Sequence, residues 1–276
     1  MRREPTARQL RLATELRRLR EAAGLTGRQA AALLGVSPTH ITHIESALAG
    51  VSEQRLRRLA SHYACTDEEF IDSLVSMATD RTRGWWEEYR GLLPTSFLDL
   101  AELEHHATFL HEVAILYVPG LLQTEDYARA VFSSRVPQLA SEELELRVQH
   151  RMRRQRITIP YDLVIHEAAL RIRVSDRAAS RAQLAKLLNR SEADHISVRV
   201  IPFDLDGFAS AASAMTHVGG PVPGLDTVVR DVPHGSAFID SVAQLGAFRT
   251  RFRKVEDVAL DAEQSRDFIN GLAKEL

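Results

Sequence analysis

Cysteine, lysine and long apolar runs are all scarce in this 276-residue chain. The single cysteine, Cys65, excludes an intramolecular disulfide and any zinc site built from several cysteines. No apolar run approaches the roughly 20 residues that a membrane-spanning helix needs, and the first residues contain no apolar signal core. We therefore expect a cytoplasmic protein that makes no contact with a membrane.

Charge is distributed unevenly along the chain, although the net charge is only -2. Residues 1–65 contain 11 Lys+Arg against 5 Asp+Glu, whereas the remainder contains 24 against 32. A basic segment suits contact with phosphates, and an acidic remainder keeps the molecule in solution and can face another partner. The composition is that of a globular protein, and the length allows two domains.

Residues 1–78 are predicted to form an all-α bundle. Gly24 ends a first helix, Thr26 caps a second, and Gly35 makes the turn that follows. Ser37 caps a third helix, with Pro38 at a first helical position that tolerates proline. We expect the five helices at about 9–23, 26–34, 38–47, 52–63 and 66–77.

Residues 84–276 are predicted to form a larger C-terminal α+β domain, with the boundary at 79–83. The segment 84–156 has mainly helical patterns. Beyond it, β-like runs alternate with helices, and a Gly/Pro-rich stretch punctuates the strand region. We expect strands at 161–165, 196–201 and 227–232, and helices at about 180–188, 240–254 and 261–276. The fold class is α+β, with a helix-turn-helix bundle followed by helices and a small β-sheet.

The segment LGVSPTHITHIE, residues 34–45, is the most specific local signal. It predicts a tight turn followed by a capped helix that packs through Ile41 and Ile44. The exposed face of that helix is expected to carry Pro38, Thr39, His40, Thr42 and His43. Short polar side chains of this kind suit the major groove, where base edges present donors, acceptors and methyl groups.

Together with LRRLREAAGLT, residues 16–26, this segment resembles the lambda-repressor/Cro-like family of helix-turn-helix domains. The resemblance implies base contacts by Pro38, Thr39 and His43, and a structural ion pair between Arg20 and Glu45. The full set of expected DNA contacts is Arg17, Gly27, Arg28, Ser37, Pro38, Thr39, His40, Thr42 and His43.

Gly27 departs from that family's pattern, because many relatives have a phosphate-contacting glutamine there. At this position only a backbone N–H at a helix terminus remains to meet phosphate. Arg17 or Arg28 is expected to compensate for the missing side chain.

The C-terminal region carries further motifs, above all VPGLLQTEDYAR at 118–129, with GWWE at 84–87, EAAL at 167–170 and IPF at 201–203. These resemble an actinobacterial family of regulators in which a lambda-repressor-like domain precedes an antitoxin-like domain. The resemblance implies a small acidic partner protein encoded nearby. From the residues themselves, Pro119-Gly120 predicts a turn and Thr124 a helix cap, so the motif is interpreted as architectural, with a pocket or partner surface as the alternative.

The helix expected at 141–156 presents an apolar stripe beside a cationic one formed by Arg147, Arg151 and Arg154. Guanidinium groups in a row suit carboxylates or phosphates. The predicted ligands are an acidic partner, flanking DNA, or intramolecular carboxylates such as Glu142 or Glu145.

Catalytic and cofactor motifs are lacking, including nucleotide-binding glycine loops, the HExxH helix and the GxSxG elbow. The cluster EHH at 104–106 with His111 and Glu112 is interpreted as lying on different helix faces, which disfavours a metal site. Asp162 and Glu167 suggest the paired acids of a nuclease, but Ala169 stands where such an enzyme needs lysine. We expect no enzymatic activity, no cofactor and no metal.

The sequence therefore predicts a regulator that binds double-stranded DNA, forms a homodimer, and uses its second domain to sense a signal or bind a small partner protein. The alternative is an antitoxin-like interaction module that neutralises a small partner and binds DNA mainly for autoregulation.

Overall fold

The computed structural model describes residues 4–206, 214–232 and 235–276. The chain forms two compact units that divide between Glu87 and Glu88, within the short 3-10 helix η1 (Trp85–Tyr89). Among the described residues, no helix is long and apolar enough to cross a membrane. Each unit has its own hydrophobic core and is described by itself.

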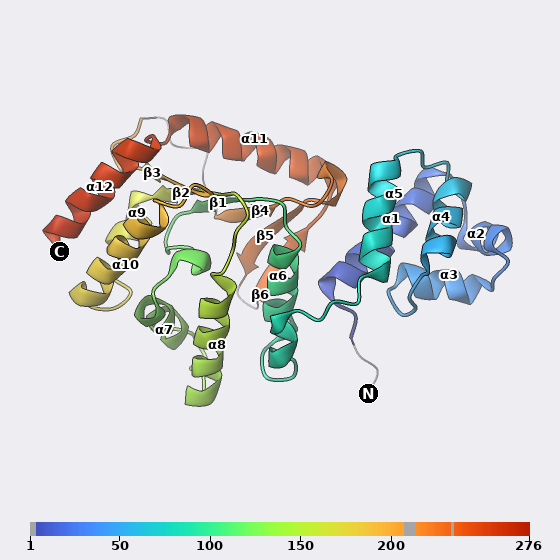
Figure 1. Ribbon diagram of the computed structural model, residues 1–276, viewed down its shortest axis with the longest axis horizontal. Coiled ribbons are helices and arrows are strands. Elements are labelled where there is room, and N and C mark those ends of the chain that lie inside the picture. Colours follow the sequence, from blue (N-terminus) through green and yellow to red (C-terminus); the bar gives the residue numbers. More distant parts are fainter. Residues whose placement is uncertain (1–3, 207–213, 233–234) are drawn as a thin grey trace. The chain divides into compact units, whose positions relative to one another are not determined.

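The N-terminal unit is a bundle of five helices (Figure 1). They are α1 (Ala7–Ala22), α2 (Gly27–Leu34), α3 (Pro38–Glu45), α4 (Glu53–His62) and α5 (Glu68–Thr79). Leu16, Ile41, Leu56 and Leu74 are among its most deeply buried side chains. One residue from each of four helices thus contributes to a single apolar centre.

The residues that cap α2 and α3 are those expected from the sequence, whereas α1 begins earlier than expected, after Thr6, and α3 ends earlier, at Glu45. Thr26 forms a capping box with Gln29 at the start of α2, and the Ser37 hydroxyl accepts a hydrogen bond from the His40 N–H in α3. Gly24 and Gly35 have φ values of 70° and 72°, which glycine adopts without steric cost. The turn between α2 and α3 is therefore fixed by local chemistry.

The C-terminal unit is built on a six-stranded mixed sheet of order β3-β2-β1-β4-β5-β6. The strands are β1 (Leu110–Ala114), β2 (Tyr161–His166), β3 (Ile196–Ile201), β4 (Met215–Val218), β5 (Thr227–Val232) and β6 (Gly235–Ile239). Strands β1, β2 and β3 are parallel, whereas β4 pairs antiparallel with β1, and β5 and β6 continue in the antiparallel sense. The fold class is α+β.

Helices cover both faces of this sheet (Figure 1). They are α6 (Thr95–His105), α7 (Glu125–Ser133), α8 (Ser141–Arg154), α9 (Glu167–Arg171), α10 (Arg177–Arg190), α11 (Val242–Val258) and α12 (Ala262–Glu275), with the 3-10 helices η2 (Gly120–Leu122) and η4 (Pro223–Leu225). One face packs on α11 through Phe248 and Phe252, while Tyr161 and Leu163 of the other face join the core beneath α7, α10 and α12.

The sheet is larger than the small one expected, because three strands were not foreseen. Strand β1 lies in the segment expected to be mainly helical, β4 ends just before the Gly/Pro-rich stretch, and β6 follows β5. In β1 the polar pair His111 and Glu112 interrupts the apolar residues, so five residues give no clear alternation. Tertiary pairing with β2 and β4 sets this strand.

Candidate nucleic-acid interface

Helix α3 is held rigidly by its apolar side. Ile41 and Ile44 are 2% and 3% exposed, and together they anchor the helix to the bundle. Because the buried side is fixed and the start of the helix is capped by Ser37, the outward side has a defined orientation.

The outward side of α3 is short and polar, as predicted, but its two histidines are less exposed than expected. Ser37, Pro38, Thr39 and Thr42 are exposed, whereas His40 and His43 are half-buried. The Thr42 hydroxyl donates to the Pro38 carbonyl oxygen at 3.2 Å, so its methyl group is the freer part for a ligand. This side therefore presents small groups that a duplex can approach closely.

A bidentate ion pair joins α1 to the end of α3. Arg20 donates from Nε and Nη2 to the two carboxylate oxygens of Glu45 at 2.7 and 2.9 Å, and from Nη1 to the Leu25 carbonyl oxygen at 2.7 Å. The hydrogen bonds to Glu45 raise the pKa of Arg20. The pair expected from the sequence is present, and it ties the end of α3 to α1.

The arginines expected beside the groove differ in how free they are. Arg17 donates to Glu21 at 2.8 Å, whereas Arg28 is exposed and makes no ion pair within the described part of the chain. Gly27 has open space where a Cβ would stand, so its backbone is accessible. Of the residues expected to meet phosphate, Arg28 is the most available.

Arg55 is a candidate contact that the sequence analysis missed. It lies in the first turn of α4, and its Nη1 is 3.5 Å from Nε2 of His40 on α3. The sequence does show an arginine three residues after the helix-capping Ser52. The proximity of that arginine to α3, however, depends on how α3 and α4 pack.

The three α8 arginines of the predicted cationic stripe, Arg147, Arg151 and Arg154, are bound within the C-terminal unit. Arg154 forms a buried bidentate ion pair with Glu104 of α6, and Arg147 pairs with Glu143 of its own helix. Arg151 instead donates from Nη1 to the neutral Oε1 of Gln123 at 2.7 Å. The carboxylates expected as partners were the wrong ones: Glu145 binds Arg129, and no described contact joins Glu142 to these arginines.

The segment 118–129 forms a polar hub. The Gln123 amide donates to the Val118 carbonyl oxygen at 2.7 Å, and the Lys186 ammonium donates to the Gln123 carbonyl oxygen at 2.7 Å. The Thr124 N–H donates to Oε1 of Gln183 at 2.8 Å, which ties this turn to α10. These contacts give the segment an architectural role and also hold Arg151 in place.

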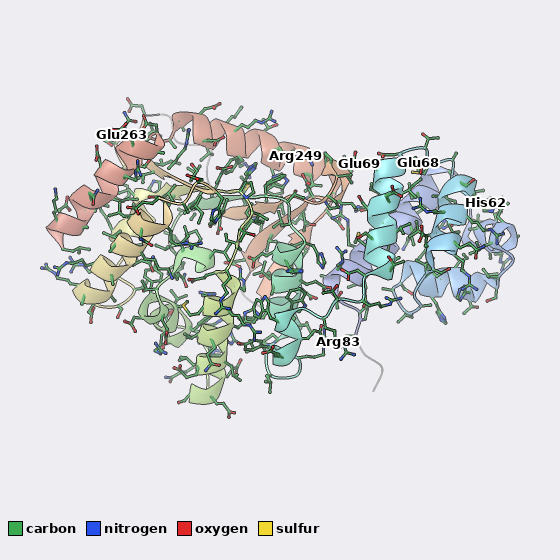
Figure 2. The ribbon with its side chains drawn as sticks, in the orientation of Figure 1. His62, Glu68, Glu69, Arg83, Arg249 and Glu263 are labelled. Atoms are coloured by element: carbon green, nitrogen blue, oxygen red, sulfur yellow. The ribbon has the colours of Figure 1, made fainter. Side chains whose placement is uncertain are left out.

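A second polar cluster lies on the opposite face of the sheet, under α11. His217 Nε2 is 2.8 Å from the Asp226 carboxylate, which also accepts hydrogen bonds from Arg249 (labelled on α11 in Figure 2) and from the Gly220 N–H. Burial opposes ionisation, but the hydrogen bonds from His217 and Arg249 lower the pKa of Asp226. These residues line a groove, and no serine, cysteine or lysine is among its described lining residues. The Asp226 carboxylate is thus paired within the cluster, with His217 and Arg249.

The fold separates the residues of the histidine- and glutamate-rich cluster at 104–106, 111 and 112. Glu104 and His106 are at the end of α6, whereas His111 and Glu112 are on strand β1, not on a helix as expected. Within residues 4–206, 214–232 and 235–276, no three His, Cys, Asp or Glu side chains are arranged to hold a metal ion.

The two units match different family models. Residues 11–70 match the model of a helix-turn-helix domain, which covers α1 to α4 and supports a DNA-binding regulator. Residues 97–271 match a second model, described as a domain of unknown function (DUF5753). The chain belongs to the DUF5753 family. Searches of curated proteins and of solved structures found no match. The DUF5753 match contains the whole sheet and α8, so the hub around Gln123 lies within the family's domain.

Proposed function

We propose that this protein is a sequence-specific transcriptional regulator that inserts α3 into the major groove of double-stranded DNA. The observation that carries the proposal is the fixed outward side of α3, which presents Ser37, Pro38, Thr39 and Thr42 to solvent on a helix anchored by buried isoleucines. Side chains of this size allow the helix backbone to come close to base edges.

The charges around α3 support the same orientation. Arg28 in the first turn of α2 and Arg55, beside His40 in the first turn of α3, are exposed arginines. They are suited to the phosphates on either side of the groove, which position the helix without reading sequence. The accessible backbone at Gly27 adds an N–H donor at a helix start.

The proposal gives the C-terminal unit the task of receiving a signal or binding a small partner protein, and it includes a homodimer acting in the cytoplasm. A single helix-turn-helix contacts few base pairs, so two copies reading half-sites about one helical turn apart give useful affinity. The excess of acidic residues beyond residue 65 keeps non-specific attraction to DNA confined to the first unit.

The test is selection of bound fragments from a fragmented genome by the purified full chain, followed by fluorescence anisotropy on a selected and a scrambled duplex. We expect the selected duplex to bind at least about a hundredfold more tightly at physiological salt. Equal affinity for both duplexes, or no complex even at low salt, would contradict the proposal. Co-purification of a neighbouring gene's product in fixed ratio, with weak and unselective DNA binding, would instead favour the antitoxin-like function.

A further inference from the structure

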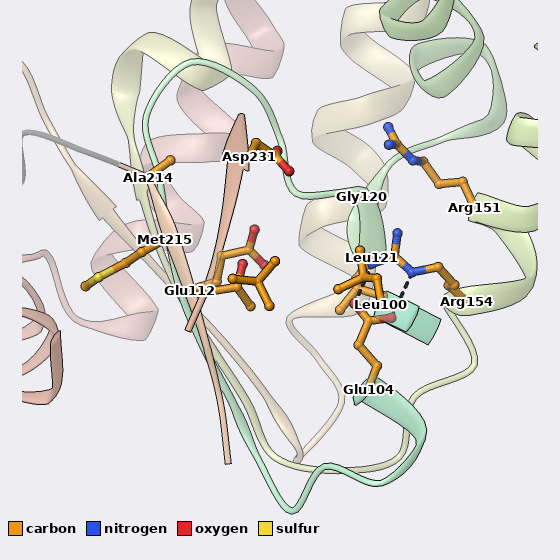
Figure 3. Close-up of a pocket in the computed structure, with 12 residues that line it drawn as sticks. Leu100, Glu104, Glu112, Gly120, Leu121, Arg151, Arg154, Ala214, Met215 and Asp231 are labelled. Atoms are coloured by element: carbon orange, nitrogen blue, oxygen red, sulfur yellow. Dashed lines mark hydrogen bonds and ion pairs between the residues drawn. The ribbon is translucent and has the colours of Figure 1, made fainter. Parts of the chain in front are cut away.

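A partly open cavity of about 120 Å³ lies between the sheet and the helices α6 and α8 (Figure 3). Its walls come from α6, β1, η2, α8, β4 and β5, all within the C-terminal unit. A space of this size holds several water molecules or one small organic molecule. It is distinct from the DNA-reading surface.

One wall of the cavity carries two arginines, and only one of them forms an ion pair with a carboxylate. Arg154 is matched by Glu104, and both side chains are less than a tenth exposed. Arg151 lines the same cavity, but its contacts are the Gln123 amide and the ring of Phe132, whose centroid is 4.1 Å from Cζ. Its Nε is buried and has no hydrogen-bond partner among the described residues. Arg151 as a whole is half-buried. A guanidinium partly withdrawn from water without a carboxylate is costly, and an anionic ligand would offset that cost.

The opposite wall carries two carboxylates (Figure 3). Glu112 projects from β1 and accepts a hydrogen bond from the Tyr161 hydroxyl at 2.6 Å. Asp231 of β5 is exposed and lines the same space, and neither carboxylate has an ion-pair partner among the described residues. Burial raises the pKa of Glu112 to about 7 and lowers that of Arg151 to about 9.

Gly120 leaves the room that this arrangement needs. A Cβ at this position would lie 3.3 Å from Nε of Arg151, which is tighter than ordinary contact. The Pro119-Gly120 turn therefore lets the arginine extend along the cavity wall, while Gln123 of the same segment holds its Nη1. The sequence motif that builds the hub thus also orients the cationic wall.

We propose that this cavity binds a small zwitterionic amino acid, with its carboxylate on the Arg151 guanidinium and its ammonium group between Glu112 and Asp231. Setting aside the Arg154–Glu104 pair, the walls present one cation facing two carboxylates. An inorganic phosphate dianion would meet net repulsion here, whereas a molecule with both charges is attracted at both ends. Leu100, Leu121 and Val229 supply apolar contacts for a short side chain. The role of this ligand as the signal that the C-terminal unit receives rests on the proposed function.

Isothermal titration of the full chain with glycine, L-alanine and L-serine tests the site, with acetate, methylammonium and inorganic phosphate as single-charge controls. We expect at least one amino acid to bind, and the control ions to bind at least about tenfold more weakly. Binding by acetate or phosphate as tight as by the best amino acid, or no binding of any amino acid at millimolar concentration, would overturn the proposal.

Variants locate the binding. Arg151→Gln is expected to weaken binding at least about tenfold. Arg153→Gln on the same helix, whose partner is the exposed Glu88, is expected to leave it within about twofold. Glu112→Gln keeps an acceptor for Tyr161, so it tests the ammonium end even if Arg151→Gln fails to fold. Equal losses in Arg153→Gln and Glu112→Gln would overturn the site.

Duplex binding is measured on the same preparations. Loss of selective duplex binding with amino-acid binding intact would overturn the proposed function alone, and the reverse result would overturn only the cavity.

Discussion

Helices α3 and α8 use polar residues in opposite ways. The outward side of α3 carries small uncharged groups in water, and its rigidity comes from two buried isoleucines. Helix α8 instead buries Arg147 and Arg154 within the C-terminal unit, where each needs a carboxylate. A surface helix can therefore change its polar residues at little cost to the fold, whereas α8 is constrained by its partners.

The largest expected effect comes from breaking the buried pair that typifies α8. Glu104→Ala leaves the Arg154 guanidinium buried without a counter-charge, and we expect it to lower the unfolding free energy by about 3–5 kcal/mol. Urea denaturation followed by circular dichroism measures this. The matched control is Glu88→Ala, which breaks an exposed pair with Arg153 and should cost about 1 kcal/mol or less. Similar losses in the two variants would erase the contrast between buried and exposed arginines.

The next effect depends on pH and concerns the carboxylate facing α8. Glu112 has its pKa raised from 4.5 to about 7 in the folded protein, mainly by burial. The folded state therefore holds this proton more tightly, so the stabilisation is complete below the unfolded pKa and is lost as pH rises toward 7. We expect Glu112→Gln, which cannot ionise, to gain roughly 3 kcal/mol relative to the natural protein between pH 4 and 8.

Unfolding free energies of both proteins at those two pH values measure the gap. A constant difference across the range would show that Glu112 does not ionise differently on folding.

The comparison also explains which parts of the molecule the sequence could predict. In the N-terminal unit, Thr26, Gly35 and Ser37 act on their own neighbours, so helix limits and the exposed face of α3 follow from local chemistry. The sequence could not predict that Arg55 lies beside His40, because this proximity depends on how the helices pack.

The C-terminal unit was less predictable because its contacts join distant residues. Arg154 lies 50 positions from Glu104, and local spacing suggested nearer carboxylates. Strand β1 is defined by β2 and β4, its neighbours in the sheet. The cationic stripe of α8 was visible in the sequence, whereas the cavity it lines required the fold.

A smaller effect is expected on the outward side of α3. Thr39→Ala and His43→Ala each shorten a side chain on the outward side of α3, where Thr39 is exposed and His43 half-buried. With α3 docked as proposed, we expect each to reduce discrimination between selected and scrambled DNA by about 1 kcal/mol, or roughly fivefold. Anisotropy titrations measure the ratio of affinities. Ser61→Ala, an exposed change at the end of α4, serves as the control and should leave the ratio unchanged. Unchanged stability in all three variants would support the tolerance ascribed to surface positions.

The smallest expected effect distinguishes an arginine that contacts phosphate from side chains that contact bases. Arg28 is exposed and makes no ion pair in the described part of the chain, so Arg28→Ala should weaken binding to any duplex by well under about 1 kcal/mol at physiological salt, without changing discrimination. Its signature is the salt dependence: loss of one phosphate contact reduces the slope of log affinity against log salt by about 0.9. Arg57→Ala is the control, because Glu53 and Asp72 already hold that guanidinium. If Arg28→Ala lowered discrimination as Thr39→Ala should, Arg28 would be reading bases and the division of labour around α3 would need revision.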